Sequence, residues 1–296
     1  MEGWVVVSCL LTWLLLYFGS YKSLEKTLLV MVLFFSFMTL IIAISMQSTE
    51  YQVSFTQISQ GLTFSFPTEY LPLALAVFGF TGISYGEIMA YTYWCLEKGY
   101  AKNSGNDLEE TKHWIRTMQT DVWVTVFFIT LGTLPFFFLG AGVLNNLPEL
   151  QESLATSSFW DVDVISSLQN MFSLVLGGWA KWLFIILAFF VLFSTLLSGT
   201  AAFTRTISDY LISMGLVKEK IDTRGKLIKL IAFLIPFLSG LFYFILPNPI
   251  TLLLIAGIWA AMGLPIVNIG ALYLINKLDP VLQPKIGTII ILWMSL

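Results

Sequence analysis

Long apolar stretches alternate with short polar ones along the whole chain. A helix that crosses a bilayer needs roughly 17 to 25 mostly apolar residues. We predict spans at approximately 4–18, 25–46, 71–96, 121–144, 180–203, 227–246 and 250–275, with an eighth apolar start at 286–296. The pattern indicates an all-α polytopic membrane protein of about seven transmembrane helices plus a partial eighth, with residues 1–296 forming a single transmembrane domain. The first and last spans are short, so we expect a chain truncated at both ends.

The third span has an unusual polar residue. It reads LPLALAVFGFTGISYGEIMAYTYWCLEK from Leu71 to Lys98, and it places Glu87 past its middle, close to Gly79, Gly82 and Gly86. A carboxylate at that depth is costly in hydrocarbon and by default marks a functional site. The clustered glycines favour unwinding of the helix, and broken helices near the midplane expose backbone carbonyls to ions in many secondary transporters. The span therefore predicts an ion-handling helix.

Close helix packing is the alternative explanation for these glycines. Gly82 and Gly86 form a GxxxG pair, with Gly79 on roughly the same face, and this spacing lets membrane helices approach closely. Packing does not explain Glu87, and we favour the functional interpretation. In the seventh span, GLPIVNIG places Asn268 inside the membrane, where it either contacts a hydrated ion or belongs to a kinked packing helix.

Basic residues orient the chain in the membrane. Of its 15 lysines and arginines, all but Lys181 lie at or after the ends of the first, third, fifth and seventh spans. The positive-inside rule makes those segments cytoplasmic. We therefore expect an integral protein of the plasma membrane with cytoplasmic loops at 19–24, 97–120, 204–226 and 276–285. In the long outer loop, helical spacing of apolar residues from Asp161 to Leu176 predicts an amphipathic helix that caps the bundle.

Composition narrows the function. The chain is 57% hydrophobic and 11% charged, and its net charge of −3 gives no indication that it binds nucleic acid. It has no GxxxxGK[ST] phosphate loop, which argues against a nucleotide partner. Its one histidine, His113, is expected to be a solvated loop residue, and Cys9 and Cys95 lie in apolar segments. Without a cluster of metal ligands we expect no enzyme and no cofactor.

Three segments resemble a known family. FGFTGISYGEIMAYTYWCLEKGYAK, LFSTLLSGTAAFTRTISDYL and AAMGLPIVNIGALYLINKLDP are similar to the natural resistance-associated macrophage protein (NRAMP) family of divalent-metal transporters. The YWCLEKGYA stretch resembles the NRAMP-related, magnesium-transporter-like branch. The resemblance implies part of a 5+5 inverted-repeat fold, also seen in sodium-coupled amino-acid carriers. It places the start of this chain in the fourth helix and its end inside the eleventh, without the first three helices and the first broken helix.

The resemblance also implies a modified ion site. When the chain is aligned on Gly82, Gly86 stands where ordinary members have the methionine of their Ala-x-x-Met-Pro-His motif, Glu87 replaces the proline, and Ile88 replaces the histidine. Loss of the soft thioether and gain of a hard oxygen favour magnesium. The missing histidine, which the family uses for proton movement, favours transport without proton coupling.

Several residues follow as expected parts of this site. Glu87 is expected to bind the metal directly or through water, with a backbone carbonyl around Gly82 or Ile83, and Gly86 contributes by its small size. We expect Tyr85, Tyr91 and Asn268 to line a cavity.

Secondary transport of a divalent metal cation, Mg²⁺ or Mn²⁺, is the function we expect from the sequence. The expected partners are the lipid bilayer and the divalent ion. The alternatives are a carrier of another solute with the same fold, or a non-transporting truncated membrane protein.

Overall fold

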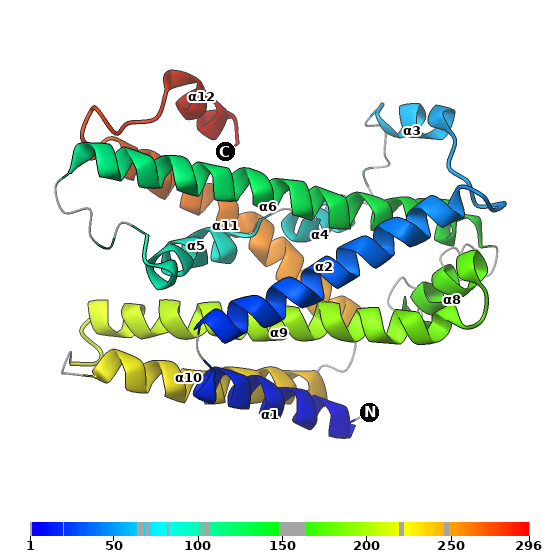
Figure 1. The fold of residues 1–296 in the computed structure, drawn as a ribbon, viewed down its shortest axis with the longest axis horizontal. Coiled ribbons are helices and arrows are strands. Elements are labelled where there is room, and N and C mark those ends of the chain that lie inside the picture. The colour runs from blue at the N-terminus through cyan, green and yellow to red at the C-terminus, as the bar shows by residue number, and fades with distance from the viewer. Residues whose placement is uncertain are drawn as a thin grey trace. The chain divides into compact units, whose positions relative to one another are not determined.

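A computed structural model of the chain describes residues 2–19, 21–63, 68, 71–81, 83–100, 102, 107–147, 164–218, 222–245 and 249–295. Across these ranges the regular structure is helical, without strands (Figure 1). The helices in chain order are α1 (Glu2–Phe18), α2 (Tyr21–Met46), α3 (Phe55–Gly61), α4 (Leu71–Thr81), α5 (Tyr85–Lys98), α6 (Leu108–Gly142), η2 (Leu144–Asn146), α8 (Val164–Leu176), α9 (Ala180–Ser213), α10 (Thr223–Ile245), α11 (Pro249–Ile275) and α12 (Ile286–Met294).

Five of these helices are long and apolar enough to cross a membrane. They are α2, α6, α9, α10 and α11, by length and composition. Helix α1 is apolar but shorter, and the predicted third span is divided between α4 and α5, each of which is too short to cross alone. The predicted class, an all-α polytopic membrane protein, is confirmed.

Two helices extend well beyond their predicted spans. Helix α6 starts at Leu108 rather than near 121, and α9 continues to Ser213 rather than stopping near 203. The expected loops 97–120 and 204–226 are therefore partly helical, and His113 lies exposed on α6 instead of in a loop. Asp107 begins α6, because its Oδ1 accepts a hydrogen bond of 2.9 Å from the Glu109 N–H. Hydropathy detects the apolar part of a helix and misses such a polar extension.

The chain divides into two compact units. The first unit comprises Met1–Ser65 and Val124–Pro247, and the second comprises Phe66–Trp123 and Asn248–Leu296. In the first unit α9 packs against α1, α2, α8 and α10. Its core is built from apolar side chains of several helices, namely Ile42, Ala43, Met46, Leu139, Val143, Met171, Phe172, Ala180, Phe184 and Leu187.

Helix α8 closes this core from one end. The amphipathic helix predicted between 161 and 176 is present from Val164 onward, and residues 161–163 lie outside the described part of the chain. Met171 and Phe172 are almost completely buried, and the Phe172 ring meets that of Phe184 on α9 at 5.3 Å between centroids. The expected role of the segment, capping the bundle, is consistent with this packing.

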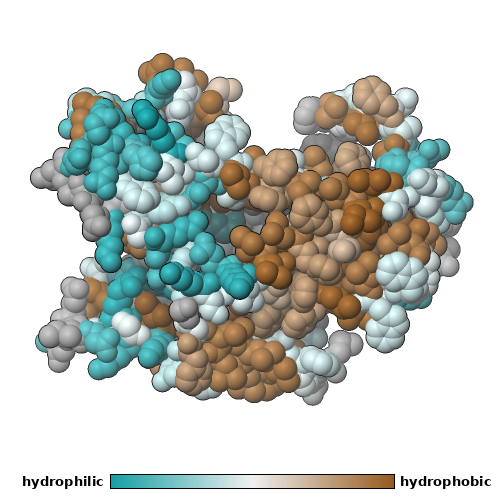
Figure 2. Space-filling view, in the orientation of Figure 1, coloured by the Kyte–Doolittle hydropathy of each residue, from teal (hydrophilic) through white to brown (hydrophobic). Residues whose placement is uncertain are grey.

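Polar residues of the first unit gather where α9 ends and α10 begins. Figure 2 shows apolar side chains over α1 and much of α2, with hydrophilic ones near the start of α10. There Arg224 Nε donates to Asp209 Oδ1 at 2.7 Å, and Lys229 lies over the Tyr17 ring. An apolar belt with charges and tyrosine at its edge is what a membrane-spanning bundle requires at the interface.

In the second unit α11 is the central helix, in contact with α4, α5 and α12. Helix α4 comes close to it, because two glycines meet. A Cβ added to Gly79 would overlap the carbonyl group of Gly257, and Ala261 lies beside them, buried. With no side chain between them, the two backbones touch directly, as small residues allow in membrane helices. The packing explanation of the sequence pattern is therefore correct for Gly79.

We expect Gly79→Ala to destabilise the protein, because the new methyl group has only backbone to displace. Overpacking of this kind costs about 1–3 kcal/mol. The matched control is Gly270→Ala on α11, where an added Cβ meets no atom of the described residues within 4 Å. The measurement is the temperature at which half of the purified protein stays monodisperse in detergent. Equal values for the two variants would contradict direct backbone contact between α4 and α11.

Candidate functional site

The predicted unwinding of the third span is present. Helix α4 ends at Thr81 and α5 begins at Tyr85, with Ser84 in extended conformation as its N-cap. Gly82, which the sequence places at the centre of this break, lies outside the described residues. Since the chain is divided here, Gly79 and Gly86 belong to different helices and do not form one continuous packing face.

A break of this kind leaves polar backbone groups at two helix ends. The last four carbonyls of α4 and the first four N–H groups of α5 have no partner within their own helix. Thr81 Oγ1 donates at 2.9 Å to the Val77 carbonyl, which lies one turn earlier inside α4 and is not one of these four. The carbonyls at the end of α4 form the negative end of its dipole, which attracts a cation. Ile83, whose carbonyl the sequence analysis expects to bind metal, lies within this break.

Glu87 is held at the start of α5 by a reciprocal capping box. Its Oε2 accepts a hydrogen bond of 2.7 Å from the Ser84 N–H, and the Ser84 hydroxyl accepts from the Glu87 N–H at 3.4 Å. The side chain is exposed. A carboxylate has lone pairs for about four hydrogen bonds or ligands, so the capping bond leaves acceptor capacity for a cation. A negatively charged side chain thus lies beside the break, three residues after the Ser84 cap.

The space beside Glu87 is open. Among the described residues, chain neighbours aside, a Cβ added at Gly86 would meet only Ser84 Oγ within 4 Å, at 3.8 Å. None of these contacts requires glycine here, in contrast to Gly79. The open position is consistent with room for an ion that keeps part of its water shell.

The three expected cavity-lining residues each have a defined contact elsewhere. Tyr85 Oη accepts a hydrogen bond of 3.0 Å from Trp259 Nε1 on α11. Tyr91 Oη donates to the Met118 carbonyl on α6 at 3.2 Å, beside a groove of about 390 Å³ between α5 and α6. Asn268 donates to Ser295 Oγ, after α12, at 3.0 Å. Of the three residues, Tyr85 is the one close to Glu87, because it lies two positions before it at the start of α5. The cavity-lining roles stay predictions.

Trp259 and Gly263 are site neighbours that the sequence analysis missed. They lie one turn apart on α11, and a Cβ at Gly263 would overlap the Tyr85 ring. The tyrosine ring therefore lies flat over the glycine while its hydroxyl reaches the indole. The i, i+4 spacing of a tryptophan and a glycine was the available signal, but it is too common in membrane helices to single out a site.

Asp121 was also missed. Its Oδ2 accepts a hydrogen bond of 2.7 Å from Tyr100 Oη and lies 3.7 Å from Lys98 Nζ, and the Tyr100 ring stacks on Trp114. These contacts tie the end of α5 to the first part of α6. They concern the far end of α5, away from the break.

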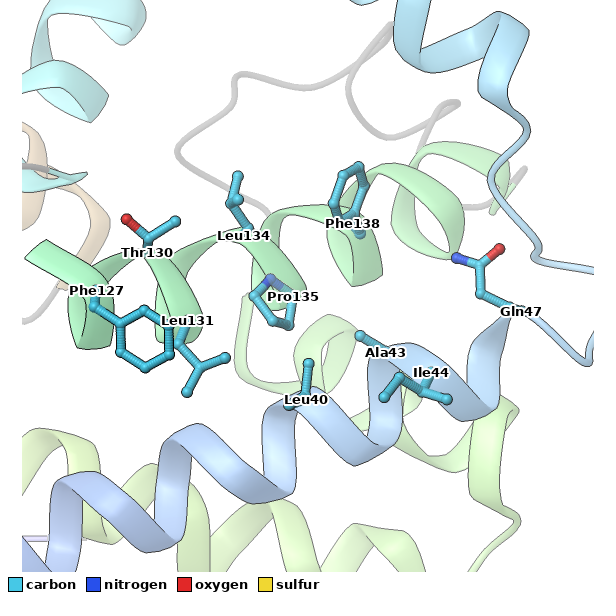
Figure 3. Close-up of a pocket in the computed structure, with 10 residues that line it drawn as sticks. All are labelled: Leu40, Ala43, Ile44, Gln47, Phe127, Thr130, Leu131, Leu134, Pro135 and Phe138. Atoms are coloured by element: carbon cyan, nitrogen blue, oxygen red, sulfur yellow. The ribbon is translucent and has the colours of Figure 1, made fainter.

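Among the described residues no group of three or more His, Cys, Asp or Glu side chains could hold a metal. A site at the break would therefore use one carboxylate, backbone carbonyls and water. The groove of about 390 Å³ between α2 and the second part of α6 does not offer an alternative (Figure 3). Its walls are apolar apart from Gln47 and Thr130, and the Thr130 hydroxyl donates to its own backbone at the Val126 carbonyl.

Apolar helices of membrane-spanning length and a helix broken at a carboxylate define a polytopic membrane protein of the transporter class. The chain belongs to the Nramp family, because the model of the family described as natural resistance-associated macrophage protein-like matches residues 1–294. A search of curated proteins and a search of solved structures gave no significant match. Membership makes the chain an integral membrane transporter of divalent metal cations, in a family of transporters rather than enzymes.

Proposed function

We propose that this protein moves Mg²⁺ across the plasma membrane without coupled proton movement, with the ion bound at the break between α4 and α5. The observation that supports the proposal is the capped carboxylate of Glu87 beside the open position of Gly86. Mn²⁺ is the second candidate, because the same oxygen ligands suit it.

The groups that could bind a metal ion at the break are hard oxygen ligands. The segment ISYGEI, residues 83–88, contains no methionine, cysteine or histidine. Its contributions are the Glu87 carboxylate and the backbone carbonyls around Ile83. Magnesium takes oxygen ligands in octahedral geometry and is commonly bound by one or two carboxylates while it keeps several waters. An open site with one carboxylate therefore suits magnesium better than softer metals, which accept sulfur or imidazole ligands.

The absence of a histidine at the break supports uncoupled transport. Ile88 stands in that position, and the one histidine of the sequence, His113, lies exposed on α6 against Trp114. An isoleucine cannot take up or release a proton. Transport without proton coupling would be driven by the electrochemical gradient of the ion alone.

The orientation follows from charge. We place the segments 19–24, 97–120, 204–226 and 276–285 in the cytoplasm, since basic residues gather there. The Lys98–Asp121 and Arg224–Asp209 pairs would then lie at the cytoplasmic interface.

The role of Glu87 as a ligand can be separated from its role as a cap. In α3, Gln57 forms the same capping box with Ser54, so Glu87→Gln is expected to keep the box while losing the charge. We expect Mg²⁺ uptake into liposomes by the full-length protein to fall about tenfold or more in Glu87→Gln, because a hard ligand is removed. Glu87→Ala removes the cap too, at a further cost of about 1 kcal/mol in stability.

The control for this series is Glu109→Gln, which removes an exposed carboxylate paired with Lys112 on α6 and is expected to transport normally. Normal uptake by Glu87→Gln together with weak uptake by Glu87→Ala would show that Glu87 only caps the helix.

Gly86→Met should shift selectivity toward softer ions. It places a thioether at the open position beside Glu87, and sulfur favours softer metals over Mg²⁺. We expect the ratio of Mg²⁺ to Mn²⁺ or Cd²⁺ uptake to fall several-fold, whereas Gly86→Ala, which adds bulk without sulfur, should change the ratio much less. An unchanged ratio in Gly86→Met would place the ion elsewhere.

Proton coupling is tested directly by loading the same liposomes with a pH-sensitive dye. Because no histidine lies at the break, Mg²⁺ uptake should proceed with no acidification of the lumen beyond that of protein-free liposomes. Acidification that grows in proportion to the metal taken up would contradict uncoupled transport.

A further inference from the structure

The two halves of the broken helix are fastened to α11 in different ways. Helix α4 comes close to α11 at Gly79, where an added Cβ would overlap the carbonyl group of Gly257. Helix α5 reaches α11 at its first residue through a side chain, since the Tyr85 ring lies over Gly263 and its hydroxyl accepts from Trp259. All of these residues belong to the second unit.

The two contacts differ in how readily they can open. Separating α4 from α11 would leave a gap between two backbones that no side-chain rotation could fill. At its first residue, separating α5 from α11 requires that one aromatic ring leave a glycine surface and that one hydrogen bond break. The first turn of α5 is thus the part of the break that can move at low cost.

Tyr85 is also placed to control Glu87. It is the first residue of α5, directly after the Ser84 cap and two positions before Glu87. Because the capping box ties Glu87 to Ser84, a displacement of this turn moves the carboxylate with it. The position of Tyr85 therefore determines where the Glu87 carboxylate lies relative to the end of α4.

We propose that Tyr85 is a positioning residue and a latch: its ring over Gly263, held by Trp259, keeps Glu87 at the break, and this contact opens when α5 moves during transport. The inference rests on the proposed function only where it assigns the ion to Glu87. The latch itself concerns the contact that holds the start of α5 against α11.

Three variants open the latch in different ways. Tyr85→Phe and Trp259→Phe each remove the hydrogen bond and keep an aromatic ring, so both should fold. Gly263→Ala displaces the ring, because its Cβ would overlap the ring atoms. Gly270→Ala, farther along α11 in open space, is the matched control.

Hydrogen exchange on the purified protein without metal tests the latch independently of the ion. We expect amides at the start of α5, residues 85–89, to exchange about two- to tenfold faster in the three latch variants, with α4 and the control variant unchanged. The double variant Tyr85→Phe/Trp259→Phe should exchange no faster than either single one, because both remove the same bond.

Transport kinetics test the positioning role. The KM for Mg²⁺ should rise about two- to tenfold in the latch variants without a fall in the maximal rate, because Glu87 is held less firmly while the turn moves more freely. Faster exchange with a raised KM supports the proposal. Unchanged exchange in all three variants overturns the latch, and faster exchange with unchanged KM overturns the positioning of Glu87. If Glu87→Gln transports normally, the proposed function fails while the exchange result still decides the latch.

Discussion

Inside a bilayer every backbone polar group needs a partner, and this requirement governs the structure around residues 81–85. Hydrocarbon offers no hydrogen bonds, so a continuous helix is the ordinary solution. The break between α4 and α5 departs from it, and the chain compensates locally at the start of α5, where Ser84 and Glu87 cap each other. The carbonyls that remain at the end of α4 are the groups to which a cation can bind in place of water.

The same carboxylate serves structure and transport in this account. Glu87 stabilises the start of α5 by satisfying a backbone N–H, and its exposed position leaves its other lone pairs for an ion. A capping role alone would be met equally well by glutamine, as Gln57 meets it in α3. A negative charge at the break is what glutamine lacks, and that charge is costly in a membrane unless a cation or water faces it.

The sequence predicted much of the fold, because hydropathy and helix length are governed by the bilayer. It located the long apolar helices, the break near Glu87 and the helix ending at Leu176. It misplaced the start of α6 and the end of α9, since their polar extensions lie outside the apolar pattern. For the candidate site, the sequence pointed to Glu87 and Gly86, whose roles stay predictions, but it did not show the partners of Tyr85, Tyr91 and Asn268. Those contacts join residues far apart in sequence, such as Tyr85 with Trp259, and depend on tertiary packing.

Locating the ion in the protein tests most directly whether it binds at the break through Glu87. Anomalous scattering from Mn²⁺, which accepts the same oxygen ligands as Mg²⁺, would locate the ion in crystals of the full-length protein. We expect a peak between the end of α4 and the start of α5, on the Glu87 carboxylate directly or across one water, and no peak there in Glu87→Gln crystals. A peak only at another position, for example beside Asp121, would contradict it.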